Sequence, residues 1–345
     1  MLRRQDLYPF AMSALGSIAD LLRLRGQAIF CLHSVTDERT KILPRGRMSV
    51  TADSLSDLIT SFQKRGIACV SLDEAIKRLQ RRDRSPFVSF TFDDGYRDNY
   101  EVAFPVFKRH SVPFAIFLTT GLLDRTFPMW WHLLEHVVES NHHVDFRGTR
   151  YPSHDPGTKA RSYEVLDAQF RSLSRAEEVA ASIDLWRAQP SGLVQDEIFS
   201  FALDWSMVRE MSESGLVTFG GHTVSHPVLA RLSEAELRDE FGLCRDRIME
   251  EARVAPSFFA YPFGQPGEVG QVAPGILMES GYDFGFTTCS RPIAHSDLDM
   301  PAKLPRIMLV RKSQAAVIAR AYLSGLPFQL KSSMGSLKGS KGSSK

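Results

Sequence analysis

Four short apolar runs, each part of an alternation with helical patterns, constrain the fold of this 345-residue chain most strongly. They are rich in β-branched and aromatic residues, as strands are, and they span residues 28–35, 87–92, 114–120 and 216–219. Helical patterns are found at 54–66, 71–82, 99–110, 233–253 and 313–324. Strands that alternate with helices indicate an α/β fold with repeated βα units around a parallel sheet or barrel. Such a sheet is buried on both faces, which explains the nearly continuous apolar runs.

The composition is that of an ordinary globular protein, with 43% hydrophobic and 24% charged residues. A chain of this length can bury a large core in one big domain or in two smaller ones. The formal net charge is only +2, so the overall charge gives no support to a nucleic-acid partner. The four cysteines are scattered without a C-x-x-C pair, and we expect buried free thiols in a reducing compartment.

The two ends of the chain differ from its middle. Residues 5–25 have apolar side chains at helical spacing and arginines near both ends, so a helix within 1–27 could rest on a membrane surface or pack on its own domain. We favour packing. Residues 331–345 are mainly Lys, Gly and Ser and predict a disordered basic tail. Without a clear signal peptide or spanning segment, we expect a cytoplasmic protein, free or peripheral to the inner membrane face.

The βα rhythm stops after Gly121 and resumes near Trp205. Residues 122–204 show no clear strand; they predict a helix at 128–140, a loop at 148–158 and a charged helical stretch at 161–187. We therefore expect a barrel domain over 28–330 that is interrupted by a helical insertion at 122–204. Insertions at the active face of a barrel commonly shape the substrate cleft.

Two adjacent carboxylates, Asp93 and Asp94, end the apolar run at 87–92. Catalytic residues of α/β proteins lie at the carboxyl ends of strands, so both are well placed for chemistry. Taken alone, the pair could equally cap the helix that follows, with Asp94 or Asp98 accepting amide hydrogen bonds.

Two histidines, His222 and His226, follow the run at 216–219 and are preceded by two glycines. If the segment forms a helical turn, this spacing brings both imidazoles to one face. Together with Asp94 they would supply two nitrogens and one oxygen, the ligand set of a catalytic zinc or iron site. Asp93 could then take a proton from water whose pKa the metal lowers. The constellation predicts metal-assisted hydrolysis of a carbonyl substrate.

A rival metal motif lies in the insertion, where His132, Glu135 and His136 form the H-x-x-E-H pattern of inverted zinc peptidases. On a helix both imidazoles would share one face, but the site needs a third ligand. The sequence offers no convincing one, so we rank this peptidase hypothesis below the first site.

Three segments resemble, in order, the first three motifs of polysaccharide deacetylases (carbohydrate esterase family 4). They are Thr-Phe-Asp-Asp-Gly at 91–95, His-Thr-Val-Ser-His at 222–226 and Phe-Ala-Tyr-Pro-Phe-Gly at 259–264. The resemblance covers roughly 28–121 and 205–310. It implies a distorted, incomplete (β/α) barrel and an enzyme that removes acetyl groups from sugars.

The resemblance also implies roles for individual residues. Asp93 would be the general base, and Asp94, His222 and His226 would hold the metal. The backbone N–H of Phe263 would donate to the oxyanion, a contact that typically contributes about 3 kcal/mol.

Two departures from the family pattern involve charged groups. Ala260 stands where the third motif normally has an Arg that pairs with the catalytic Asp, and no His occurs in the final motif at 304–309. Arg306 could supply the missing cation. His33, at the end of the run at 28–35, could supply the missing acid, as in the branch of the family with shifted strand order. His295 is a weaker candidate for the acid.

We therefore predict a metal-dependent deacetylase of N-acetylated sugars in a polysaccharide or glycoconjugate. The expected cofactor is a divalent metal, zinc first, with iron, cobalt, nickel or manganese as alternatives. Two other functions stay open: hydrolysis of small non-sugar amides, and a glycan-binding pseudoenzyme. We expect the substrate to be contacted by Tyr96, Trp130, Tyr261 and Phe263. Trp131 could also stack on a sugar ring.

Overall fold

The computed structural model describes residues 15, 26–36, 48–127, 129–187, 199–309 and 315–327. Its centre is a curled parallel sheet with the strand order β11-β10-β9-β6-β5-β1-β12, and β4 pairs with β5 beside this path. The strands are β1 Gln27–Leu32, β4 Ala68–Cys69, β5 Phe87–Phe92, β6 Phe114–Leu118, β9 Val217–Gly221, β10 Phe258–Ala260, β11 Phe284–Phe286 and β12 Ile307–Met308. The predicted α/β fold with an incomplete barrel is confirmed.

One short segment joins the two edges of this sheet. Leu304 forms a parallel bridge with Phe286 of β11, and its carbonyl accepts a hydrogen bond from the Thr287 amide at 2.8 Å. A few residues later, Ile307 of β12 pairs with Phe30 of β1. The chain at 304–308 therefore closes the curled sheet and places residue 306 between its two edges.

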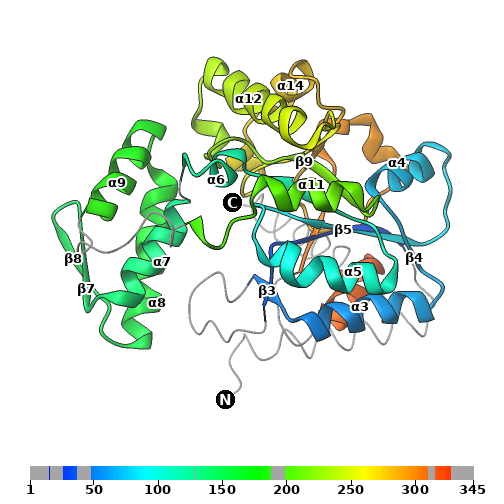
Figure 1. The fold of residues 1–345 in the computed structure, drawn as a ribbon, viewed down its shortest axis with the longest axis horizontal. Coiled ribbons are helices and arrows are strands. Elements are labelled where there is room, and N and C mark those ends of the chain that lie inside the picture. Colours follow the sequence, from blue (N-terminus) through cyan, green and yellow to red (C-terminus); the bar gives the residue numbers. More distant parts are fainter. Residues whose placement is uncertain are drawn as a thin grey trace, which may run out of the picture.

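Helices surround the sheet, with α3 and α5 below it and α12 and α14 above it in Figure 1. The longer barrel helices are α3 Ala52–Lys64, α4 Leu72–Gln80, α5 Phe104–His110, α11 Trp205–Glu213, α12 Glu234–Ala252, α14 Ala273–Glu279 and α15 Ala315–Leu323. Their starts follow the sequence: Ser233 caps α12 in a capping box with Glu236. The helix predicted over 99–110 begins instead as a π-helical turn, η1 Asn99–Ala103, followed by α5, because Pro105 cannot donate a backbone hydrogen bond.

Alternating side chains of β6 pack in two different hydrophobic clusters. In β6, Phe114, Ile116 and Leu118 pack in the cluster between sheet and helices. Ala115 and Phe117 pack in a second cluster inside the curl of the sheet. This period of two decides which residues near the strand ends face the interior of the barrel.

The insertion lies to the left of the sheet in Figure 1. It consists of α7 Trp130–Ser140, β7 His143–Phe146, β8 Thr149–Pro152, α8 Pro156–Ser172 and α9 Arg175–Arg187. The expectation that it has no strand was wrong, because β7 and β8 form an antiparallel hairpin. Arg147 and Gly148, both with positive φ, make the two-residue turn that such a hairpin requires.

Several predictions concern the ends of the chain and the cysteines. Within the helix predicted over 5–25 only Leu15 lies in the described residues; it is helical and packs against the main core. The tail predicted at 331–345 lies outside them. No helix in the described ranges is both long and apolar enough to cross a membrane. All four cysteines are free, and Cys289 is exposed, contrary to the expected burial.

Candidate active site

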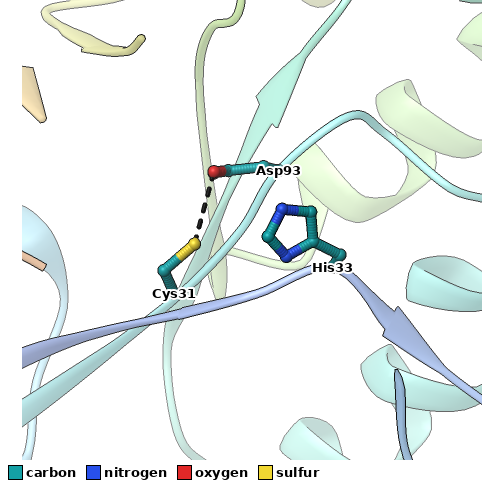
Figure 2. Close-up of side chains that lie close together, drawn as sticks. All are labelled: Cys31, His33 and Asp93. Atoms are coloured by element: carbon teal, nitrogen blue, oxygen red, sulfur yellow. Dashed lines mark hydrogen bonds between the residues drawn. The ribbon is translucent and has the colours of Figure 1, made fainter. Parts of the chain in front are cut away.

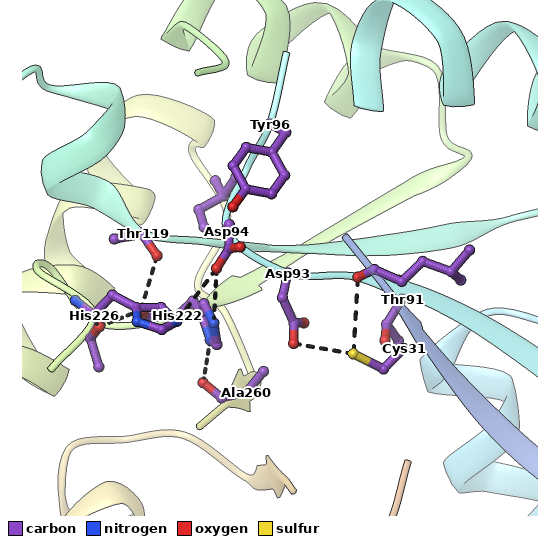
Figure 3. A network of polar contacts seen from close by, with 12 residues as sticks. Cys31, Thr91, Asp93, Asp94, Tyr96, Thr119, His222, His226 and Ala260 are labelled. Carbon is purple, nitrogen blue, oxygen red and sulfur yellow. Dashed lines mark hydrogen bonds and ion pairs between the residues drawn. The ribbon is translucent and has the colours of Figure 1, made fainter. Parts of the chain in front are cut away.

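The predicted site residues meet where the parallel strands end. Asp93 and Asp94 follow β5, His222 follows β9, and His33 follows β1. The carboxyl ends of neighbouring parallel strands lie at one edge of a sheet, so these side chains gather there although they are far apart in sequence (Figure 2 and Figure 3).

Asp94, His222 and His226 form a compact buried cluster. The Asp94 Oδ1 atom lies 3.4 Å from Nε2 of His222 and 3.5 Å from Nε2 of His226. Although buried, this oxygen has no hydrogen-bond partner among the described residues. The two imidazole nitrogens and this unpaired carboxylate oxygen are the three ligands that a catalytic site offers to a divalent cation. The residues therefore fit a metal.

The surroundings of the two imidazoles suit them to metal binding. His222 Nδ1 lies 2.6 Å from the carbonyl oxygen of Ala260, so it donates there and turns Nε2 toward Asp94. Burial lowers the pKa of His222, but the Asp94 carboxylate outweighs it and the net shift is upward. Burial also lowers the pKa of His226, to about 3, which keeps that ring neutral at ordinary pH.

The loop that carries both histidines is held from two sides. The Glu240 carboxylate, on α12, accepts hydrogen bonds from the amides of Val224 at 2.8 Å and Ser225 at 3.1 Å, and from the Ser225 hydroxyl. On the other side, the Gly121 amide donates to the Val224 carbonyl at 2.8 Å. We did not predict Glu240, because it belongs to a helix whose sequence shows only ordinary amphipathic spacing.

The backbone of the site is strained at four non-glycine residues. Asp94, Thr223, His226 and Phe263 have φ values of 75°, 70°, 53° and 59°. Left-handed conformations are rare in such residues and gather at functional sites. At Asp94 this conformation turns the chain out of the β5 alternation, which allows neighbouring carboxylates to reach one pocket.

Asp93 faces the interior of the barrel, where Arg306 meets it. Arg306 donates from Nη1 to Oδ1 at 2.6 Å and from Nη2 to Oδ2 at 2.7 Å, and both residues are buried. Burial raises the pKa of Asp93, but the guanidinium outweighs burial and lowers that pKa to about 2. The cation absent at Ala260 is thus present beside Asp93, contributed by the closing segment of the sheet.

A thiol completes the surroundings of Asp93. Cys31 Sγ lies 3.3 Å from Asp93 Oδ2 (Figure 2). Cys31 and Asp93 face each other because β1 and β5 pair in register, Cys31 opposite Thr91. Burial raises the pKa of Cys31 well above its ordinary value, so the thiol stays protonated and can donate to the carboxylate. No motif in the chain predicted this contact.

His33 lies at the same edge, beside the carboxylates. Its ligand nitrogen is within 4.8 Å of a carboxylate oxygen of Asp93. Its Nδ1 is buried without a hydrogen-bond partner in the described part of the chain. Burial lowers the pKa of His33, so the ring is neutral near pH 7.

A pocket of about 320 Å³ opens over these residues, and the insertion forms one of its walls. Trp130, a predicted substrate contact, lines the pocket but is only 2% exposed and stacks on Phe170. Its neighbour Trp131 is less buried, and its ring centroid lies 4.4 Å from that of His226. Both tryptophans line the pocket, and Trp131 has the more exposed ring.

The two tyrosines predicted to contact substrate also line this pocket. Tyr96 is 5% exposed, and its hydroxyl lies 3.0 Å from His132 Nε2. Tyr261 is fully buried and donates its hydroxyl to the Ala302 carbonyl at 2.8 Å. Phe263 lies over the ligand pair, with its ring 4.8 Å from that of His226.

The other histidine candidates lie outside the cluster. His132 bonds to Tyr96, whereas His136 lies 3.4 Å from the Ser140 hydroxyl at an exposed position. Within the described ranges, the groups able to hold a metal include neither of them. His295 bonds to the Leu79 carbonyl at 2.8 Å, in a segment that pairs with Gln27 at the amino end of β1, opposite to the site. It cannot be the acid.

Comparisons with known proteins agree with this architecture. The sequence model of the family described as polysaccharide deacetylase matches residues 80–202 and 190–271, more than half of the chain. No curated protein matches the sequence.

Solved structures share the fold at low identity. Deacetylase PplD of Streptococcus pyogenes has a TM-score of 0.58 and 16% identity, covering 86% of this chain and 98% of its own. IcaB from Ammonifex degensii has a TM-score of 0.55 and 18% identity, covering 87% and 97%. A de-N-acetylase from Aggregatibacter actinomycetemcomitans has a TM-score of 0.54 and 16% identity, covering 85% and 99%. From the family match and the shared fold together, the chain belongs to the polysaccharide deacetylase family.

Proposed function

We propose that this chain is a metal-dependent hydrolase that removes the acetyl group from N-acetylated sugars. Family membership makes it a glycan deacetylase; metal dependence, the N-acetyl group and the residue roles are our proposal. The observation that carries it is the buried cluster of Asp94, His222 and His226 directly beside Asp93.

Asp94, His222 and His226 would hold the metal, with zinc as the first candidate because its sites take nitrogen and oxygen ligands in this number. Iron, cobalt, nickel and manganese stay as alternatives. A divalent cation bound there supplies a Lewis acid for the acetyl carbonyl and lowers the pKa of water.

The other residues would move the protons. Asp93 takes a proton from the attacking water, whose oxygen adds to the acetyl carbon. The Phe263 backbone N–H donates to the oxygen that becomes negative. When the C–N bond breaks, the nitrogen needs a proton, and the neutral His33 ring must first acquire it. Asp93 lies close enough to pass it on. The products are acetate and an amine.

The sugar would bind against Trp131, whose ring is presented beside His226. Two similar proteins support removal of an acetyl group: PplD is known in complex with acetate, and the Aggregatibacter actinomycetemcomitans protein, a de-N-acetylase, supports the N-acetyl group. Both share the fold with this chain at 16% identity, so they support the proposal without deciding the sugar.

The test compares metal content and acetate release from N-acetylglucosamine oligomers for wild type, Asp94→Ala and His132→Ala. We expect one metal per wild-type chain, lost in Asp94→Ala and kept in His132→Ala, and acetate only from the two metal-bearing proteins. Metal lost in His132→Ala instead would favour the peptidase hypothesis. Metal at Asp94 without acetate release from any N-acetylated sugar would favour a pseudoenzyme or another amide substrate.

His33 is tested separately by His33→Ala. If His33 is the proton donor, the substitution should lower kcat by roughly 10²–10⁴-fold while leaving the metal content unchanged. The variant should lose far less activity on a substrate whose leaving group needs no proton, such as an acetyl ester of nitrophenol. Equal losses on both substrates would assign His33 a structural role.

A further inference from the structure

One wall of the pocket is a cross-link between the insertion and the barrel. Arg171, on α8, donates from Nε to Asp167 at 2.9 Å and from Nη1 to Glu268 at 3.1 Å. Glu268 belongs to α13 Pro266–Val269 of the barrel. The Arg171 guanidinium carbon also lies 4.2 Å from the centre of the Phe263 ring. All four residues line the pocket.

A second cross-link lies next to the first. Arg231, in η2 Leu229–Arg231, donates to the carbonyls of Ser172 and Leu173, the latter at 3.1 Å. These carbonyls are at the carboxyl end of α8, where a cation is favoured. The insertion is therefore fastened to the barrel at two neighbouring points. The charged side chains that form the pocket wall between α8 and α13 are paired with one another.

The wall limits the directions in which a bound glycan can continue. An acetyl group that reaches Asp94 and Asp93 places its sugar beside Trp131 and Phe263. A long chain bound through an interior sugar must leave the site on two sides. On the side of α8 and α13 it would meet the stacked Arg171 and Phe263 and the ion pair to Glu268. The volume of about 320 Å³ is at the small end for ligand pockets.

We propose that this enzyme deacetylates the terminal sugar of a glycan and not its interior sugars. The inference rests on the proposed deacetylase function. It assigns Arg171 and Glu268 as specificity-determining residues, since they close the pocket without touching the metal cluster.

The experiment uses the N-acetylglucosamine pentamer with ¹⁸O at its reducing end, which tells the two ends apart in fragment mass spectra. We expect wild type to remove the acetyl group of one terminal sugar. Removal mainly from the three interior sugars would overturn the inference while confirming deacetylation. Absence of acetate release from every oligomer would overturn the proposed function and the inference with it.

Two variants open the wall: Arg171→Ala and Glu268→Gln. Each should raise the ratio of interior to terminal deacetylation about tenfold, the effect of losing one interaction of ordinary strength. Arg161→Ala is the matched control, because Arg161 is exposed on the same helix and does not line the pocket. An unchanged pattern in both wall variants, with thermal unfolding like that of wild type, would contradict the assignment. If Arg171→Ala does not fold, the assignment is tested by comparing the positions that Glu268→Gln and wild type deacetylate in the pentamer.

Discussion

Arg306 and Asp93 form a fully buried bidentate ion pair across the closing seam of the sheet, with N–O distances of 2.6 and 2.7 Å. Arg306 is 0% exposed and also donates to the Thr91 hydroxyl at 3.0 Å. The pair explains how a chain with Ala260 in the third motif can still neutralise this carboxylate: the cation comes from another strand. It orients Asp93 and keeps it ionised.

We first predict the effect of removing this cation. Arg306→Met leaves the buried Asp93 carboxylate without a cation beside it, which typically costs about 3–5 kcal/mol of unfolding free energy. Arg306→Lys keeps the charge but cannot form the two parallel bonds, so it should fold better and still lose activity. Urea unfolding and acetate release measure both effects. If Arg306→Lys keeps wild-type kcat, the bidentate geometry is unimportant for the reaction.

Glu240 should control metal affinity without contacting the metal. Glu240→Ala removes the acceptor of all three hydrogen bonds from the loop that carries His222 and His226. Groups that orient metal ligands typically contribute 10–100-fold in affinity. We expect a loss of that size in competition with a chelator. Asp239→Ala, at an exposed position of α12, is the control and should bind metal like wild type. Equal affinities would mean that the loop holds its shape alone.

Gly121 should tolerate no side chain. A Cβ added there would lie 2.6 Å from the Val224 carbonyl oxygen, a backbone atom of the metal loop. Gly121→Ala must push the loop away and should destabilise the protein by about 1–3 kcal/mol. Gly242→Ala on α12 is the opposite case: a Cβ there meets nothing within 4 Å. Because alanine is the better helix former, it should stabilise by up to about 1 kcal/mol. The urea midpoint should be lower than that of wild type for Gly121→Ala and higher for Gly242→Ala.

Glu178 in the insertion should make stability fall as pH rises. Burial raises the pKa of Glu178, which Arg175 lowers only in part, and the value reaches about 7 against an ordinary 4.5. A carboxyl with a raised pKa contributes stability that is complete below pH 4.5 and is lost as pH rises through about 7. Glu178→Gln removes this loss. Its stability relative to wild type should therefore rise between pH 5 and pH 8, by up to about 3 kcal/mol.

Urea unfolding at pH 5, 6.5 and 8 measures this difference for wild type and variant together, so that other titrating groups cancel. A pH-independent difference would mean that Glu178 titrates normally. The Arg175 contact at 2.7 Å becomes an ion pair only as Glu178 ionises, so its contribution is already contained in the pKa of about 7.

The sequence alone determined the features that depend on neighbours along the chain. Strand and helix periods established the α/β class, because burial of one face requires a fixed spacing of apolar residues. The Asp93–Asp94 pair and the spacing of His222 and His226 pointed to one edge of the sheet, since parallel strands end together. Capping residues such as Ser233 marked helix starts for the same local reason.

Tertiary structure decided everything that depends on strand order and register. Arg306 is 213 residues from Asp93 in sequence, and only the closure of the sheet through 304–308 brings them together. Of two adjacent tryptophans, helix phase buried Trp130 and presented Trp131, because neighbours on a helix point about 100° apart. Such choices depend on which element packs against which, and no local pattern in the chain carries that information.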